Sequence, residues 1–186
     1  MMRSAGIAAA VAVLALAGCG GGSTSAPAES PPAAATSAAP SPVAKDDACG
    51  LLTVEEINGV LGWPFGEGEQ STDDARQIVT CQYTMTDDST GVELPVGIVA
   101  VGVSQIDGQE SYDTNYELAP AYFGADPEPT EVAGADKAYI VIEEEMQAPV
   151  IGMLVGERFV SIQVGLEGAT AEQAQQLATI AAGRAG

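Results

Sequence analysis

Histidine is absent from the 186 residues of this chain. Its absence excludes Ser-His-Asp and Cys-His nucleophile systems. It also excludes any zinc site that requires an imidazole ligand. No Ser-x-x-Lys pattern is present either, so the serine–lysine chemistry of penicillin-binding enzymes has no counterpart here. We therefore expect a protein that is not an enzyme, and we assign no catalytic residues.

Positive charge is scarce as well. Six Lys and Arg residues stand against 26 Asp and Glu residues, for a formal net charge of −20. Nucleic-acid binding depends on Lys and Arg contacts to phosphate, so nucleic acid is excluded as a partner. Attachment to anionic lipid through a basic patch is excluded for the same reason. Solubility is the simpler explanation of the acidity; a site for cations or basic partners is the alternative.

A long apolar run is the third missing feature. The longest near the start covers residues 7–17, little over half of the about 20 residues that a membrane-spanning helix needs. Arg3 is the only charge before Glu29. A basic start, a short apolar stretch and small residues before a cleavage point are typical of an export signal. We expect residues 1–18 to be a signal peptide.

Cys19 follows this run after a single residue, Gly18. The stretch Leu16-Ala17-Gly18-Cys19 resembles the bacterial lipobox at every position. The resemblance implies cleavage before Cys19 and a diacylglycerol on its thiol, with a further acyl chain on the new amino group. Two or more chains anchor a protein stably, so the expected location is the outer face of the cell membrane. An ordinary secretory signal with an incidental cysteine is the alternative.

The next segment has the composition of a tether. Nearly every residue from Cys19 to position 45 is Gly, Ser, Thr, Ala or Pro. Such a segment cannot bury enough apolar surface to fold, and it behaves as a flexible linker. Residues 46–186 have the length of one domain. We therefore expect a lipidated tether over 19–45 and a single folded domain over 46–186.

Only two cysteines remain once Cys19 is lipidated. Cys49 and Cys81 form an even pair in an oxidising compartment, and a disulfide between them is the natural interpretation. A two-thiol metal site is the alternative, although the chain offers no histidine and no further cysteine to complete it. We expect no metal and no cofactor.

The local patterns predict three helices and five strands. Residues 53–56 and 170–173 are capping-box patterns that begin helices, and Gly62 and Gly183 are the expected helix ends. A third helix is expected over 111–123, broken at Pro120. Strict apolar–polar alternation over 79–85 predicts a strand with Cys81 on its buried face. The other expected strands are 96–106, 137–142, 150–155 and 158–164, the last two joined by a type II′ turn at Gly156-Glu157.

This order is helix–strand–strand–helix–strand–strand–strand–helix. It predicts an α+β domain with an antiparallel sheet of about five strands and the helices packed on one face. In that arrangement a Cys49–Cys81 disulfide would hold the start of the first helix against the sheet.

Several short motifs together resemble one family. They are Cys49-Gly-Leu-Leu-Thr, Cys81-Gln82-Tyr83 and residues 132–139, read with the lipobox and the tether. The chain resembles the uncharacterised actinobacterial lipoproteins grouped as domain of unknown function 3558. That family often has tryptophan two residues after the second cysteine, where this chain has Tyr83. The resemblance implies a disulfide-pinned α+β domain outside the membrane, and it implies no activity.

Three acidic stretches are candidates for chemistry. Residues 143–145 are three consecutive glutamates, whose side chains would alternate in direction on an extended segment, so we interpret them as a solvated turn. Residues 87–93 do not match an EF-hand, because Thr86 and Gly97 would occupy its first and last ligand positions. The carboxylates within residues 67–74 could act in a hydrolase only if two of them lay at a defined distance from each other. We regard a carboxylate-based hydrolase as the least favoured function.

The aromatic residues leave one further question open. Residues 63–65 and the tyrosines at 112, 116 and 122 either line an apolar pocket or belong to the core. We expect a lipid-anchored extracytoplasmic module that binds a small ligand or an envelope protein. The alternative is a structural or accessory envelope lipoprotein. The first predicts a concave site, whereas the second predicts a contiguous exposed apolar patch. The sequence assigns no ligand-binding residue.

Overall fold

The computed structural model describes residues 43–87, 94–143, 145 and 147–186. The predicted signal peptide, Cys19, most of the expected tether, residues 88–93 and Glu144 lie outside the described residues. Within the described part, no helix is both long enough and apolar enough to cross a membrane.

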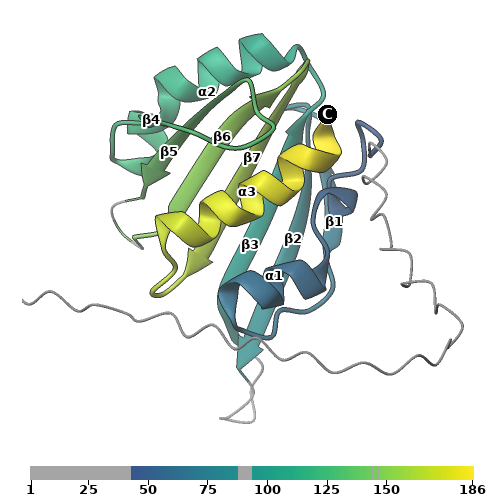
Figure 1. The fold of residues 1–186 in the computed structure, drawn as a ribbon, viewed down its shortest axis with the longest axis vertical. Helices are drawn as coiled ribbons and strands as arrows, with labels where there is room; N and C mark the ends of the chain where they lie inside the picture. Colours follow the sequence, from purple (N-terminus) through teal and green to yellow (C-terminus); the bar gives the residue numbers. More distant parts are fainter. Residues whose placement is uncertain (1–42, 88–93, 144, 146) are drawn as a thin grey trace, which may run out of the picture. The chain divides into compact units, whose positions relative to one another are not determined.

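A seven-stranded antiparallel sheet forms the centre of the domain, in the order β1-β2-β3-β7-β6-β5-β4 (Figure 1). The strands are β1 (Glu69–Asp73), β2 (Ile78–Asp87), β3 (Leu94–Ser104), β4 (Glu128–Thr130), β5 (Lys137–Ile142), β6 (Pro149–Val155) and β7 (Arg158–Leu166). The helices are the short 3-10 helix η1 (Cys49–Leu51), α1 (Val54–Leu61), α2 (Gly108–Phe123) and α3 (Ala171–Ala185).

The α+β class and the antiparallel sheet are as predicted, but the predicted count of five strands was wrong. The two additional strands, β1 and β4, lie at opposite edges of the sheet. Without them the observed order matches the predicted one. Edge strands need no alternation of buried apolar residues. Four of the five β1 residues are exposed. β4 contains Pro129, and within sheets proline is found mainly on edge strands. Neither strand therefore carries a strand-like sequence pattern.

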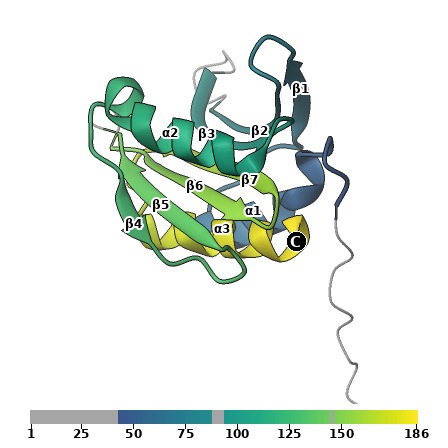
Figure 2. The same ribbon diagram turned by 90° about the horizontal axis from the view of Figure 1, so that it is seen from above.

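The prediction that all helices lie on one face was also wrong. In Figure 2, α1 and α3 cover one face of the sheet and α2 covers the other. Consecutive residues of β5 show the division, because Ala138 belongs to the core under α3 and Tyr139 to the core under α2. All seven residues of β6 are buried. A strand covered on both faces has a continuous apolar sequence rather than an alternating one.

The larger core lies between the sheet and the pair α1 and α3. The inward face of α3 consists of Ala174, Leu177, Ala178 and Ala181, which are fully buried. The small alanine side chains let α3 approach the sheet closely. Burial of Leu177 alone contributes roughly 1.5–3 kcal/mol.

Both predicted capping boxes are confirmed. The hydroxyls of Thr53 and Thr170 accept hydrogen bonds from the third residue of their helices, and those residues, Glu56 and Gln173, bond back to the cap. Gly62 ends α1 in the left-handed conformation with φ of 77°.

One predicted helix end, at Gly183, was wrong, and so was the predicted break at Pro120. α3 continues past Gly183 to Ala185, which is buried, and that packing offsets the about 1 kcal/mol that a helical glycine costs. α2 continues through Pro120 to Phe123. Pro120 lies in the last turn of the helix, where its missing N–H removes a single hydrogen bond.

The predicted disulfide between Cys49 and Cys81 is present, with the two Cα atoms 5.0 Å apart. It joins η1 to the middle of β2. Cys81 is fully buried on the core face of that strand, together with Val79 and Tyr83, as the alternation predicted.

Candidate binding groove

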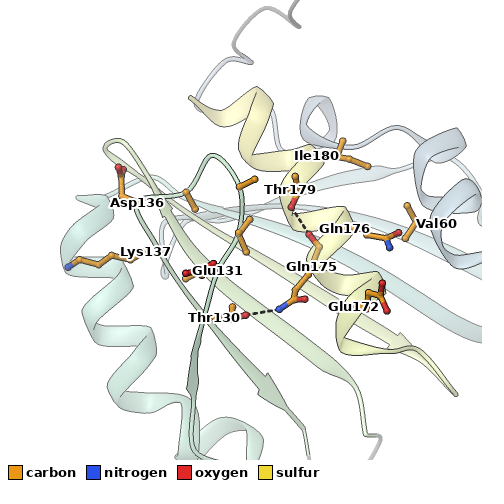
Figure 3. Close-up of a pocket in the computed structure, with 14 residues that line it drawn as sticks. Val60, Thr130, Glu131, Asp136, Lys137, Glu172, Gln175, Gln176, Thr179 and Ile180 are labelled. Atoms are coloured by element: carbon orange, nitrogen blue, oxygen red, sulfur yellow. Dashed lines mark hydrogen bonds between the residues drawn. The ribbon is translucent and has the colours of Figure 1, made fainter. Parts of the chain in front are cut away.

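An open groove of about 1000 Å³ lies between α3 and the chain segment that leads from β4 into β5 (Figure 3). One wall is α3, the other is the segment 130–138, and Val60 of α1 lies at one end. The lining residues are Val60, Thr130, Glu131, Val132, Ala133, Ala135, Asp136, Lys137, Ala138, Glu172, Gln175, Gln176, Thr179 and Ile180.

The wall formed by residues 131–136 is fixed to the rest of the domain. Val132 is buried in the larger core and accepts a hydrogen bond from the N–H of Ala135 at 3.1 Å. Asp136 is held twice: its N–H donates to the Leu154 carbonyl at 2.8 Å, and its carboxylate accepts from the Gly156 N–H at 2.8 Å. The wall is therefore tied to the β6–β7 hairpin.

The opposite wall is the outward face of α3. Glu172, Gln175, Gln176 and Thr179 follow helical spacing on the side away from the buried alanines. The amide of Gln175 donates to the Thr130 hydroxyl at 2.6 Å and so joins the two walls. This contact fixes the relative position of the helix and β4.

The groove presents more hydrogen-bond acceptors and negative charge than positive charge. Glu131 and Glu172 line it, whereas the side chains of Asp136 and Lys137 point away from α3 (Figure 3). The Lys137 ammonium instead donates to Gln109 at 3.1 Å and lies 5.6 Å from the centroid of the Tyr112 ring. The groove therefore suits a ligand that offers hydrogen-bond donors or positive charge.

Two of the three acidic stretches singled out in the sequence have structural contacts, and residues 88–93 of the third lie outside the described residues. Asp73 accepts the backbone N–H groups of Ala75 and Arg76, both at 3.1 Å, and so stabilises the turn between β1 and β2. Glu143 donates its N–H to the Ala148 carbonyl at 2.9 Å across the turn between β5 and β6. In the described ranges, no three His, Cys, Asp or Glu residues are grouped so that they could hold a metal ion.

The aromatic candidates do not form one pocket. Phe65 is buried in the larger core and Tyr112 in the smaller core under α2. Trp63 and Tyr122 are 53% and 68% exposed. The tyrosines at 112 and 116 instead pack edge-on against Tyr139, both at 5.4 Å between ring centroids. None of these aromatic residues lines the groove.

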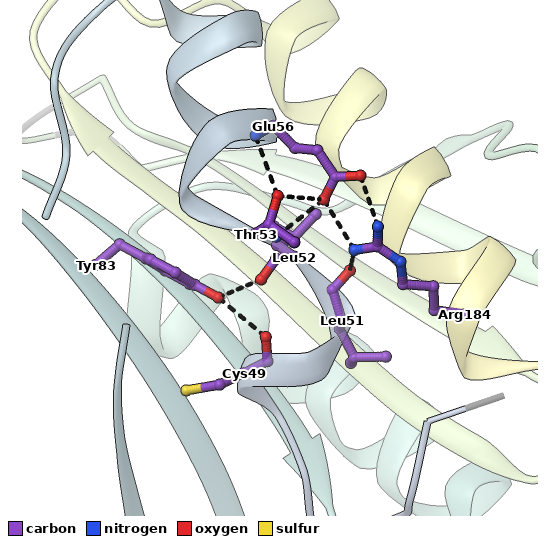
Figure 4. A network of polar contacts seen from close by, with 7 residues as sticks. All are labelled: Cys49, Leu51, Leu52, Thr53, Glu56, Tyr83 and Arg184. Carbon is purple, nitrogen blue, oxygen red and sulfur yellow. Dashed lines mark hydrogen bonds and ion pairs between the residues drawn. The ribbon is translucent and has the colours of Figure 1, made fainter. Parts of the chain in front are cut away.

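A polar network beside the disulfide is structural (Figure 4). The Arg184 guanidinium binds both oxygens of Glu56, at 2.7 and 2.8 Å, and donates to the Leu51 carbonyl at 3.1 Å. Burial raises the pKa of Glu56, but hydrogen bonds from Arg184 and Thr53 outweigh it, so the pKa lies below its usual value. The network ties α3 to the start of α1.

Tyr83 makes a second link in the same place. Its hydroxyl donates to the carbonyls of Leu52 and Cys49, at 2.5 and 3.2 Å. Burial is the main cause that raises the pKa of Tyr83 to about 12, so the hydroxyl keeps its proton and remains a donor at neutral pH.

The first described residue is also held. The Val43 N–H donates to the Arg184 carbonyl at 3.0 Å, and the Arg158 guanidinium donates to the Val43 carbonyl at 2.7 Å. The chain therefore joins the domain beside the end of α3 and the start of β7, three positions before the predicted domain start at Asp46.

Sequence reasoning missed the α3 wall of the groove. Its Glu, Gln and Thr residues have the composition of an ordinary solvated helix face. The other wall did carry a signal, because residues 132–138 lie within a motif that already suggested a family.

The family comparison bears on the same segments. A family model for a protein of unknown function (DUF3558) matches residues 14–180. The chain belongs to the DUF3558 family. The matched range contains Cys19, Cys49 and Cys81, and it includes both walls of the groove up to Ile180. A comparison with curated proteins finds no match.

Proposed function

We propose that this DUF3558 protein is a lipid-anchored, extracytoplasmic binding module whose groove between α3 and residues 130–138 holds a ligand or a protein of the cell envelope. The observation that supports it is the groove itself, about 1000 Å³ with walls joined by the Gln175–Thr130 hydrogen bond. We assign the protein no catalytic role.

The alternative, an accessory lipoprotein without a ligand, expects one contiguous apolar patch. The exposed large apolar residues of the described part instead come from separate segments. They are Trp63 after α1, Val96 on β3, Ile106 before α2, Leu118 and Tyr122 on α2, and Ile142 on β5. A few exposed apolar side chains are normal on a folded protein, so these residues by themselves do not call for the alternative.

The lining of the groove suggests the chemistry of its ligand. Val60, Val132 and Ile180 offer apolar contact, while the amides of Gln175 and Gln176 offer hydrogen bonds. The carboxylates of Glu131 and Glu172 favour a ligand with an ammonium, a guanidinium or several N–H and O–H donors. Such a few polar groups in a partly apolar site orient a ligand and give specificity.

The anchor in this proposal is Cys19. The composition of residues 19–42 predicts a flexible tether. A flexible chain of about two dozen residues has an end-to-end distance of roughly 25–30 Å. A domain on such a tether searches a thin layer above the membrane, which raises the effective concentration of membrane partners. Substitution Cys19→Ala should move the protein from the membrane fraction to the soluble or secreted fraction. Continued membrane attachment of that variant would contradict the anchor.

Native mass spectrometry tests the binding role. The protein is extracted from its own membranes in mild detergent and compared with Thr179→Trp, which fills the groove, and with the control Glu117→Trp on the exposed side of α2. We expect an additional bound mass in the wild type and the control that is lost on denaturation and reduced in Thr179→Trp. Equal occupancy in all three proteins would place the ligand elsewhere, and a bare mass in all three would contradict a retained ligand.

A further inference from the structure

A second, smaller cavity lies between α2 and the sheet, on the face opposite to α1 and α3. The aromatic stripe of α2, with Tyr112 and Tyr116, packs over β5. The polar stripe of the helix, with Glu110, Ser111 and Thr114, borders this cavity of about 290 Å³ between α2 and strands β2, β3 and β7. This cavity shares no lining residue with the groove beside α3.

The floor of the cavity lies where β3 and β7 pair. Gly102 is directly opposite Ser161 in the register, and a Cβ atom at Gly102 would lie 2.6 Å from the Ser161 hydroxyl. The glycine therefore leaves room above the floor. Beside it, the hydroxyls of Ser104 and Ser111 are 2.8 Å apart, and Ser111 also donates to the Asp107 carbonyl at 2.8 Å. These contacts hold the cavity wall in place.

Two hydroxyls at the cavity remain available to a ligand. Within the described ranges, the side chains of Thr114 and Ser161 make no hydrogen bond to another protein group, and both line the cavity. The apolar part of the lining is supplied by Ile78, Ile106 and Phe159. The cavity thus combines an apolar side with free hydrogen-bonding groups.

Among the described basic residues that line a cavity, Arg76 makes the weakest side-chain contacts with the rest of the protein. Arg158 and Arg184 hold Val43 and Glu56, and Lys137 holds Gln109. The side chain of Arg76 makes an exposed contact with Asp73 at 3.5 Å and is itself 80% exposed. Such a surface pair is worth little, so the guanidinium can exchange it for a ligand.

We propose that this cavity binds a small zwitterion of the α-amino acid class. Arg76 would pair with the carboxylate, in the geometry that guanidinium and carboxylate share. Glu110, which also lines the cavity, would pair with the ammonium, and the hydroxyls of Thr114 and Ser161 would complete the polar contacts. The volume of about 290 Å³ lies at the small end of ligand sites.

The overall charge favours a zwitterion over an anion. A chain with net charge −20 repels a free anion, whereas a zwitterion has no net charge and meets no such repulsion. A ligand with positive charge alone would leave the Arg76 guanidinium without an anionic partner. This second site is independent of the groove and of the envelope ligand proposed for it.

Isothermal titration of the detergent-extracted protein tests the assignment, with glycine, L-alanine, L-leucine and L-glutamine as probes. We expect saturable binding of at least one of them, and binding at least about tenfold weaker for its methyl ester and its N-acetyl derivative, each of which removes one charge. Absence of saturable heat for all four at about 10 mM would overturn the proposal. Equal affinity for the derivatives would overturn it as well.

Matched variants locate the site. Arg76→Gln and Glu110→Gln should each weaken binding by about tenfold or more, because each removes one charged partner. Lys45→Gln and Glu117→Gln remove exposed charges outside the cavity and should leave the affinity unchanged. All four positions are exposed, so these proteins should keep the wild-type thermal midpoint. Unchanged affinity in Arg76→Gln or Glu110→Gln would overturn the proposal.

Discussion

Arg184 is the side chain that joins the two ends of the folded domain. It is 19% exposed, its partner Glu56 is 28% exposed, and it also satisfies the Leu51 carbonyl. Replacement by alanine leaves a half-buried carboxylate and a carbonyl without their partner. We expect Arg184→Ala to lower the free energy of unfolding by about 2 kcal/mol, measured by urea denaturation.

Arg76 provides the matched control. Its contact with Asp73 is exposed on both sides, at 80% and 44%. Arg76→Ala should change the free energy of unfolding by no more than about 0.5 kcal/mol. Equal losses for the two variants would contradict a structural role of the Glu56–Arg184 pair.

The same pair makes stability depend on pH. The pKa of Glu56 is lowered in the folded protein from its ordinary value of 4.5. A lowered pKa means that the folded state favours the ionised carboxylate, so its contribution is present above about pH 4.5 and is lost as the pH falls through the folded-state pKa. The stability difference between the wild type and Glu56→Gln should therefore shrink on acidification below pH 4.5. A difference that stays constant across an acidic series of urea denaturations would refute this.

Some of these residues were predictable and others were not. The capping box of Thr53 and Glu56 is a local motif, and the Cys49–Cys81 disulfide follows from the number of cysteines. Both could be predicted from the sequence alone. The partner of Glu56 lies 128 positions away, and no local pattern connects the two. Long-range pairs of this kind depend on how helices pack, which a single sequence does not specify.

At the scale of elements, the disulfide holds η1 against β2. The bond closes a loop over 32 positions, for which the chain-entropy model gives a stabilisation of about 3–4 kcal/mol. The double variant Cys49→Ala/Cys81→Ala should lose that amount, measured by thermal or urea unfolding. It should still fold, because the Tyr83 hydroxyl makes a second link between the same elements.

The control for this prediction is reduction of the wild type. Reduced wild-type protein should unfold near the midpoint of the double variant. If the variant unfolds at the midpoint of the oxidised wild type, the disulfide contributes nothing and the account of this corner of the fold is wrong.

The elements with a strong local signal were predicted well. The turn at Gly156-Glu157 joins paired residues Val155 and Arg158, and Gly156 has a φ of 58° while Glu157 has no positive φ, as a type II′ turn requires. Edge strands β1 and β4 gave no such signal. The two-sided burial of β5 and β6, which places α2 opposite α3, was hidden because continuous apolar runs do not say what covers each face.

At the scale of the whole molecule, the groove arises from segments far apart in the chain. Residues 130–138 and 172–180 meet only because β4 and β5 form the sheet edge next to α3. The family motif marked one wall, but neither the cavity nor its acidic lining was predictable without the sheet order. The proposed anchor at Cys19 and the proposed site in the groove are therefore separate claims, tested separately.

The central claim is that the groove is occupied by a ligand or partner at the membrane. The most direct measurement is photo-crosslinking in intact cells, with p-benzoylphenylalanine in place of Thr179 in the groove or Glu117 on the exposed side of α2. We predict a light-dependent adduct of defined mass for the probe at Thr179 and none for the probe at Glu117. No adduct at Thr179, or the same adducts at both positions, would contradict the account.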